Sequence, residues 1–129
     1  MAKPNQPRPT DAELEILRVL WARGPSTVRD VHLQLNQNKP TGYTTVLKLM
    51  QIMGEKALVR RNEEQRAHVY EAALPRDTTQ QQLVGDLLDR AFGGSARQMV
   101  MHALASRPAS AEDLDEIRRL LDEYERGTR

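Results

Sequence analysis

The sequence predicts a mostly helical protein, with three short helices and a β-hairpin in its front half and three further helices behind them. Three observations lead to this prediction. Aromatic residues make up only 4% of the chain, so aliphatic side chains and methionine carry the apolar content, which suits helical packing better than a β-sandwich. Apolar residues recur at spacings of three and four in most segments. Two β-compatible segments, 57–61 and 67–72, flank a polar turn.

Length and composition limit the classes of function. At 129 residues the chain can hold one ordinary domain, or a small domain with an appendage. It contains no cysteine, which excludes disulfides, thiolate metal sites and a cysteine nucleophile. No apolar run approaches the roughly 18 residues of a membrane span, and the N-terminus lacks the apolar segment of a signal peptide. We therefore expect a cytoplasmic protein without membrane insertion.

The first helix is expected to begin at a capping box. Residues 1–9 hold three prolines and two basic residues, which predicts a disordered basic arm. Thr10 and Glu13 then have the spacing at which a hydroxyl and a carboxylate satisfy first-turn amides. Gly24-Pro25 ends the helix. Its expected core seam is Leu14, Leu17 and Trp21, flanked by Ile16 and Leu20.

A second short helix follows, capped by Ser26 or Thr27. Residues 36–40 break its pattern. His32 borders its apolar face, where a lone histidine is more often a packing or surface residue than a ligand, so we assign it no chemical role. The apolar face consists of Val28, Val31 and Leu35.

The third helix, expected over 44–56, separates packing from polar residues. Thr44, Lys48 and Gln51 fall on one face, and their hydroxyl, amine and amide groups suit phosphates and base edges in a DNA major groove. A polar outer face is usually only a solvated face. Two preceding helices and a following hairpin give the order of a winged helix-turn-helix, which favours a recognition helix. The expected packing face is Val46, Leu49, Met50, Met53 and Ala57.

The hairpin after this helix is the predicted wing. Arg60, Arg61 and Arg66 are placed to contact phosphates beside the groove. Glu63 and Glu64 at its tip count against close contact with DNA there. The wing arginines therefore form the second group of predicted DNA-binding residues.

The composition changes near residue 75. Residues 1–75 carry 11 basic and 8 acidic residues, a charge of +3, whereas residues 76–129 carry 8 and 10, a charge of −2. A basic front half fits a polyanionic partner. We expect residues 10–75 to form a winged-helix DNA-binding domain and residues 76–129 to form a three-helix dimerisation domain.

The C-terminal helices are expected over 77–92, 95–105 and the segment capped by Ser110. Their apolar stripes are wide, and about 54 residues lie near the lower limit for an independent core. A second copy would cover the stripes; the alternative is that these helices fold back onto the front domain. The residues expected at the dimer contact are Leu83, Leu87, Leu88, Met99, Leu114, Ile117, Leu121 and Tyr124.

Five stretches together resemble the penicillinase-repressor (BlaI/MecI) family: PTDAELEILRVLWARGPSTVRDVHLQL, GYTTVLKLMQIMGEKALVRR, RAHVYEA, LLDRAFGGSARQMVMHALA and LDEIRRLLDE. The resemblance implies a winged-helix domain, a helical dimerisation domain, and repression by a homodimer on a double-stranded inverted-repeat operator. Operators of this type control β-lactamase or related stress and resistance genes. By position, the implied DNA-binding residues are Thr44, Thr45 and Lys48 nearest the bases, Tyr43 and Gln51 beside them, and Arg60, Arg61 and Arg66 in the wing.

The resemblance also implies a way to end repression. In family members paired with a membrane β-lactam sensor protease, cleavage occurs at an Asn-Phe bond in the dimerisation domain. The aligned pair here is His102-Ala103, so either another protease specificity applies or this repressor answers another signal. The copper-responsive branch carries C-terminal cysteine pairs, which this chain lacks. No metal or cofactor is therefore expected.

Two other classes of function compete with repression. A winged-helix fold can serve as a protein-protein interaction module without direct DNA readout, and Glu55 with the acidic wing tip suits a protein partner. An enzyme is disfavoured, because the three histidines lie in separate segments and no phosphate-binding glycine loop or nucleophile elbow occurs.

Overall fold

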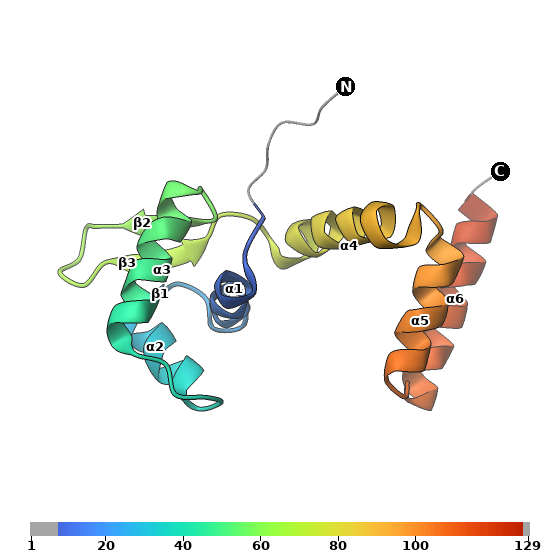
Figure 1. Ribbon diagram of the computed structural model, residues 1–129, viewed down its shortest axis with the longest axis horizontal. Helices are drawn as coiled ribbons and strands as arrows, with labels where there is room; N and C mark the ends of the chain where they lie inside the picture. Colours follow the sequence, from blue (N-terminus) through green and yellow to red (C-terminus); the bar gives the residue numbers. More distant parts are fainter. Residues whose placement is uncertain (1–7, 128–129) are drawn as a thin grey trace, which may run out of the picture. The chain divides into compact units, whose positions relative to one another are not determined.

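The computed structural model describes residues 8–127, and Figure 1 shows the order of their helices and strands. Helices dominate, as the sequence predicts. Contacts divide the chain into two compact units between Leu83 and Val84; we call the described residues before this point the front unit. The expected boundary near residue 75 stays a prediction, and most of the expected disordered arm lies outside the described residues. The elements are α1 (Asp11–Arg23), β1 (Ser26–Thr27), α2 (Val28–Asn36), α3 (Tyr43–Glu55), β2 (Val59–Asn62), β3 (Val69–Ala72), α4 (Arg76–Phe92), α5 (Ala96–Ser106) and α6 (Ala111–Gly127).

The predicted capping box begins α1. The Glu13 amide donates to Thr10 Oγ1 at 3.2 Å, and the Thr10 amide donates to Glu13 Oε1 at 2.9 Å. The predicted core seam was partly wrong, because Leu14 and Trp21 are only half-buried. The indole N–H of Trp21 donates to the Leu74 carbonyl at 3.1 Å, which holds the ring at the margin of the core. The buried side chains of α1 are Glu13, Ile16, Leu17 and Leu20.

The two candidate caps of α2 have separate roles. Thr27 is the N-cap and forms a capping box with Asp30. Ser26 lies in β1, where its hydroxyl donates to the Gly24 carbonyl at 2.8 Å. Val28 and Val31 are buried as expected.

The third helix buries Val46, Met50 and Met53. Ala57, expected on the same face, was wrongly placed: α3 ends at Glu55, and Ala57 lies beyond it, exposed, with φ +63°. The Leu58 amide donates to the Met53 carbonyl at 2.9 Å and the Ala57 amide to the Gly54 carbonyl at 3.1 Å. This pair of bonds is a Schellman motif, which turns the chain from the helix into β2.

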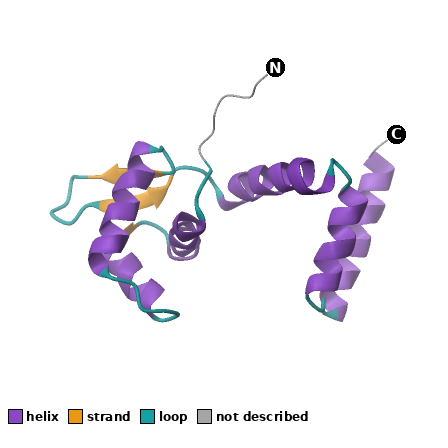
Figure 2. Cartoon of the chain, viewed as in Figure 1, coloured by secondary structure: helices purple, strands orange, loops and turns teal. Residues whose placement is uncertain are grey.

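The wing hairpin belongs to a small antiparallel sheet with strand order β1-β3-β2. The predicted hairpin is confirmed with narrower bounds, whereas β1 adds a strand that the sequence did not indicate. Val59 pairs with Ala72 and Arg61 with Tyr70. Val59 and Tyr70 are buried in the core made by α1, α2 and α3. The loop between β2 and β3 projects away from the strands (Figure 2).

The first two C-terminal helices begin and end within one residue of the predicted ranges, and the third begins directly after its predicted cap, Ser110. Gly93 and Gly94 have positive φ and end α4. Ser95 caps α5 through the Gln98 amide. Among residues 84–127 no side chain is buried. No helix of the described residues is long and apolar enough to cross a membrane.

Candidate nucleic-acid interface

The outer face of α3 gathers the predicted recognition residues. Thr44, Lys48 and Gln51 lie at helical spacing on one exposed stripe, opposite the buried methionines. Glu55 continues the same stripe at the C-terminal end of the helix. The first half of the stripe is therefore uncharged or basic, and its end is acidic. A polyanion would accordingly contact the first half rather than the end. Tyr43 and Thr45 flank the stripe at the helix start, and both are exposed.

The start of α3 differs from the starts of α1, α2 and α5. Those three helices each begin at a residue whose side chain accepts a hydrogen bond from a first-turn amide. The N-cap of α3 is Gly42, which provides no such bond, and the first turn holds no acidic residue. The first-turn amides of α3 and the positive end of its dipole therefore face outward without a neutralising side chain.

The turn between α2 and α3 is closed by one side chain. The Asn36 amide nitrogen donates to the His32 carbonyl at 2.8 Å and to the Thr41 carbonyl at 2.9 Å. The Asn36 side-chain oxygen accepts from the Thr41 amide at 3.1 Å. Nearby, the rings of His32 and Tyr43 meet edge to face with centroids 5.6 Å apart. No role was predicted for His32 or Asn36, because no local sequence pattern marks their contacts with the start of α3.

A buried ion pair fixes the other end of α3. Lys56, the C-cap residue, donates to both carboxylate oxygens of Glu13, at 2.9 and 3.0 Å. Burial, with the Glu13 side chain 2% exposed, raises the pKa of that carboxyl; the Thr10 amide and the Lys56 ammonium outweigh burial and lower the pKa below its usual value. The sequence predicted only the capping role of Glu13 in α1, not its ion pair with Lys56.

The three wing arginines are not brought together. Arg60 and Arg61 are neighbours in β2, so they point to opposite faces of the sheet. Arg60 pairs with Glu71 at 3.6 Å. A hydrogen bond with Tyr70 and an ion pair with Glu63 raise the pKa of Arg61.

Two of the predicted DNA-binding cations are not neutralised by an acidic side chain among the described residues. Within the described residues, neither Lys48 nor Arg66 forms an ion pair, and both side chains are exposed. Lys48 lies on the exposed stripe of α3, and Arg66 lies in the projecting loop of the wing. These two positions are the cations best placed to meet phosphates.

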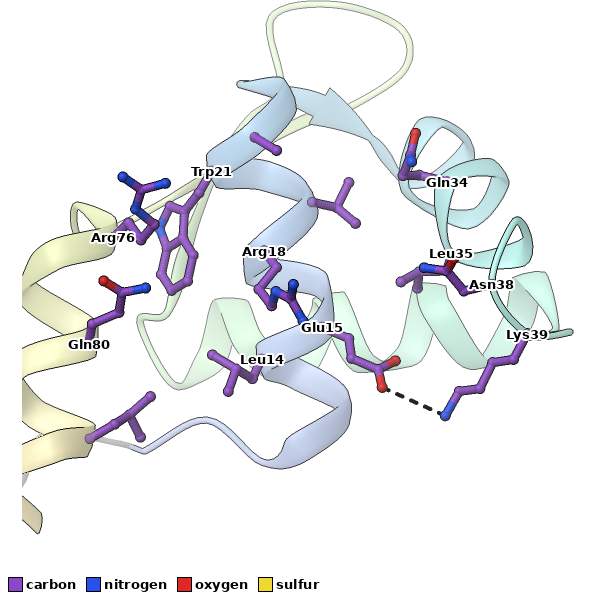
Figure 3. A pocket seen from close by; sticks show the side chains of 13 residues that line it. Leu14, Glu15, Arg18, Trp21, Gln34, Leu35, Asn38, Lys39, Arg76 and Gln80 are labelled. Atoms are coloured by element: carbon purple, nitrogen blue, oxygen red, sulfur yellow. Dashed lines mark ion pairs between the residues drawn. The ribbon is translucent and has the colours of Figure 1, made fainter. Parts of the chain in front are cut away.

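An open groove of about 680 Å³ lies elsewhere in the front unit, among α1, the end of α2 and the start of α4. Figure 3 shows the Trp21 ring on its wall beside Arg76, and Lys39 paired with Glu15 at 3.7 Å. Its lining residues belong neither to α3 nor to the wing. The groove is therefore separate from the polar face of the recognition helix.

The pair His102-Ala103, predicted as a possible proteolytic switch, lies within α5. His102 and Ala103 are both exposed. The His102 carbonyl accepts from the Ser106 hydroxyl at 2.7 Å, and its ring lies 5.8 Å from that of Phe92. A protease that cuts an extended substrate must unwind α5 locally before it can reach this bond.

The predicted dimer residues fall into two groups in the isolated chain. Leu87, Leu121 and Tyr124 expose 48%, 63% and 70% of their surface. Their neighbours on the same helices are only half-buried. The half-buried residues of the predicted set are Leu83, Leu88, Met99, Leu114 and Ile117.

Comparison with known proteins places this chain in a family. The penicillinase repressor family model matches residues 9–123. The transcriptional regulator BlaI of Mycobacterium tuberculosis is 35% identical over 118 residues, which cover 91% of this chain and 85% of that protein. The penicillinase repressor of Bacillus licheniformis is 23% identical over 118 residues, 92% of each chain.

A solved structure shares the fold. The solution structure of the Bacillus licheniformis BlaI monomeric form in complex with the blaP half-operator has a TM-score of 0.50 and 22% identity, and the match covers 57% of this chain and 89% of that chain. The similarity supports the winged-helix arrangement of the front unit. The family match over residues 9–123 and the 35% identity to the Mycobacterium tuberculosis regulator show that this chain belongs to the penicillinase-repressor family.

Proposed function

We propose that this protein is a homodimeric transcriptional repressor that reads an inverted-repeat DNA operator with α3. The observation that carries the proposal is the division of α3 into a buried apolar face and an exposed stripe with Thr44, Lys48 and Gln51. Family membership supports a regulatory rather than an enzymatic role. A repressor that binds a DNA operator would act in the cytoplasm. The genes that it controls would be those for β-lactamase or for related stress and resistance functions.

The chemistry of α3 suits the major groove. Lys48 supplies an ammonium for a guanine edge or a phosphate, and the Gln51 amide can pair with adenine. The hydroxyls of Thr44 and Thr45 can donate hydrogen bonds to acceptors on the base edges or accept them from donors there. The outward-facing amides of the first turn favour a phosphate at the groove edge. Tyr43, exposed at the same end, would lie against the sugar-phosphate backbone.

The wing contributes unequally to this proposal. Arg66 lies in the projecting loop without an ion pair among the described residues, so it is the wing residue assigned to a phosphate. Arg61 is paired with Glu63, so a phosphate would have to compete with that carboxylate for its guanidinium. Arg60 lies on the opposite face of the sheet and is paired with Glu71. We therefore rank the three arginines Arg66, Arg61, Arg60 in decreasing effect on binding.

A second copy supplies what one chain lacks. The front half of the sequence carries a charge of only +3, and the salt-dependent part of DNA affinity grows with the number of phosphates neutralised. The exposed leucines and Tyr124 of the C-terminal helices offer the surface on which two copies would pair. Two-fold symmetry then presents two α3 helices to an inverted repeat.

Selection of random duplexes by the wild-type protein tests the proposal. The recovered DNA should hold two inverted half-sites whose centres are separated by about 10 base pairs or a multiple of that distance. Lys48→Ala should weaken binding by about tenfold and reduce the salt dependence. Arg118→Ala, the same loss of charge on exposed α6, is the matched control. Failure to enrich any sequence, or affinity independent of salt, would contradict DNA readout and favour a protein partner.

Release from DNA would follow separation of the two copies. In this proposal a membrane sensor protease cuts at His102-Ala103, which detaches α6 from α4. Mass spectrometry of the protein from cells treated with a β-lactam tests this step. A fragment ending at His102 is the expected product; an intact chain in derepressed cells would show that another signal acts.

A further inference from the structure

The first turn of α3 is not held by the hydrophobic core. Tyr43, Thr44 and Thr45 are all exposed, and the first buried residue of the helix is Val46. Gly42 at the N-cap makes no side-chain bond to the turn. The part of α3 that carries two of the four proposed base-reading residues, Thr44 and Thr45, therefore depends on contacts made before the helix begins.

Those contacts come from one face of α2. His32 and Asn36 are one helical turn apart, and both reach forward to the start of α3. The Asn36 amide meets both backbone groups of Thr41, as a neighbouring strand would, and also the His32 carbonyl. The His32 ring meets the Tyr43 ring edge to face.

The chemistry of this contact requires an asparagine. The Thr41 amide needs an acceptor, while the carbonyls of Thr41 and His32 need donors. A primary amide offers both at once. An aspartate would set its second oxygen against two carbonyls, and a serine hydroxyl is too short to reach both Thr41 groups.

The far end of α3 is secured differently. Lys56 is held by the buried Glu13 carboxylate, and Met50 and Met53 are fixed in the core. With its middle and end fixed, the helix can shift chiefly at its exposed start. A small displacement there moves Thr44 and Thr45 relative to the bases.

We propose that Asn36, supported by the ring contact of His32 with Tyr43, is the positioning residue that sets the start of the recognition helix for operator reading. The inference rests on the proposed DNA-binding function. Asn36 itself need not touch DNA. Its effect should therefore fall on discrimination between operator and unrelated DNA rather than on general affinity for phosphates.

The test compares Asn36→Ala with wild-type protein on two duplexes of equal length, one selected by the wild type from random DNA and one unrelated. Asn36→Ala should bind the selected duplex about tenfold more weakly and the unrelated duplex within about twofold of wild type. Asn38→Ala, the same change two residues along the exposed turn, is the matched control and should behave as wild type. Fluorescence of Trp21 verifies that each variant is folded at the assay temperature.

A measurement without DNA separates this inference from the proposed function. Amide hydrogen exchange by NMR should speed up at Thr41, which donates to Asn36, and at Val46, which donates to the Gly42 carbonyl, while Met50 and Met53 keep their protection. Should Asn36→Ala prove unstable, Asn36→Ser gives the same comparison. If the wild-type protein enriches no DNA, the proposed function is contradicted, whereas the hydrogen-exchange comparison still tests the effect of Asn36 on the start of α3.

Three results would overturn the positioning role. The first is a variant that keeps wild-type affinity for the selected duplex. The second is an equal loss of affinity on both duplexes, which indicates a general rather than a positioning effect. The third is unchanged exchange at Thr41 and Val46 in the variant.

Discussion

Replacing Lys56 with methionine tests how the recognition helix is fixed to the fold. Lys56→Met keeps a long flexible side chain but removes both hydrogen bonds to the Glu13 carboxylate, at 2.9 and 3.0 Å. Loss of one partner of a fully buried pair costs about 3–5 kcal/mol. Here Lys56 is 34% exposed and the Thr10 amide still donates to Glu13. We therefore expect a loss of about 2–3 kcal/mol in the free energy of unfolding at pH 7.

The assay uses an internal probe. Trp21 is the single tryptophan of the chain and packs against the front core, so its fluorescence during urea or thermal unfolding reports the front unit. The expected fall in Tm is about 10–20 °C for a unit of this size. Protein concentration must be held constant, because pairing of chains shifts apparent stability. Lys48→Met is the matched control, the same change on the exposed face of α3, and should stay within about 0.5 kcal/mol of wild type.

The effect of Lys56→Met should depend on pH. In the wild type the pKa of Glu13 is lowered from its usual 4.5, so the carboxylate stabilises the fold above that pH, and this stabilisation is lost as pH falls through the lowered pKa. Without Lys56, one of the groups that lower the pKa of Glu13 is lost, so this pKa should be higher in the variant than in the wild type. As pH falls, Glu13 is then protonated at a higher pH in the variant than in the wild type, which removes its buried unpaired charge. The difference in the free energy of unfolding between variant and wild type should therefore shrink below about pH 5. A difference that is constant with pH, or no larger than that of Lys48→Met, would refute the role of the ion pair.

Three further substitutions test other features. Ala57→Gly should stabilise the front unit by about 1 kcal/mol in the same Trp21 assay, since φ is +63° at this position of a Schellman motif; destabilisation would contradict that backbone geometry. Thr27→Ala removes the capping box of α2 and should cost about 1 kcal/mol, and an unchanged midpoint would show that the cap contributes nothing. Leu121→Glu should convert a dimer to monomers in sedimentation velocity, because this exposed side chain is assigned to the pairing surface; a persistent dimer would move that surface elsewhere.

Local signals in the sequence predicted most of the element boundaries. The Thr10 and Glu13 capping box, the Gly93-Gly94 stop and the Ser110 cap each depend on neighbours within a few residues, and the structure confirms all three. Hydrophobic spacing likewise predicted the buried side of α3, apart from Ala57. A glycine normally marks the left-handed residue after a helix, and alanine at this position removed that signal.

Features that depend on distant residues could not be predicted. Nothing near Glu13 in the sequence indicates that Lys56 will meet it, because the pair forms only when α1 and α3 are packed. A strand of two residues such as β1 has no detectable alternation. Arg60 and Arg61 were predicted to act together, but their side chains leave opposite faces of β2. The recognition stripe was predictable because it follows from helical spacing alone, whereas the contact of Asn36 with Thr41 depends on how the turn closes.

The absence of any buried side chain among residues 84–127 bears on how gene expression would respond to protein level. A unit without its own core gains its packing only when two chains meet, so in the proposed dimer folding of this unit and pairing are one event. The amount of paired protein then varies with the square of the free chain concentration when most chains are unpaired. A moderate drop in synthesis would lower operator occupancy more than proportionally. Unpaired chains would also expose α5 and α6 to general proteases, which would sharpen the response without any dedicated ligand.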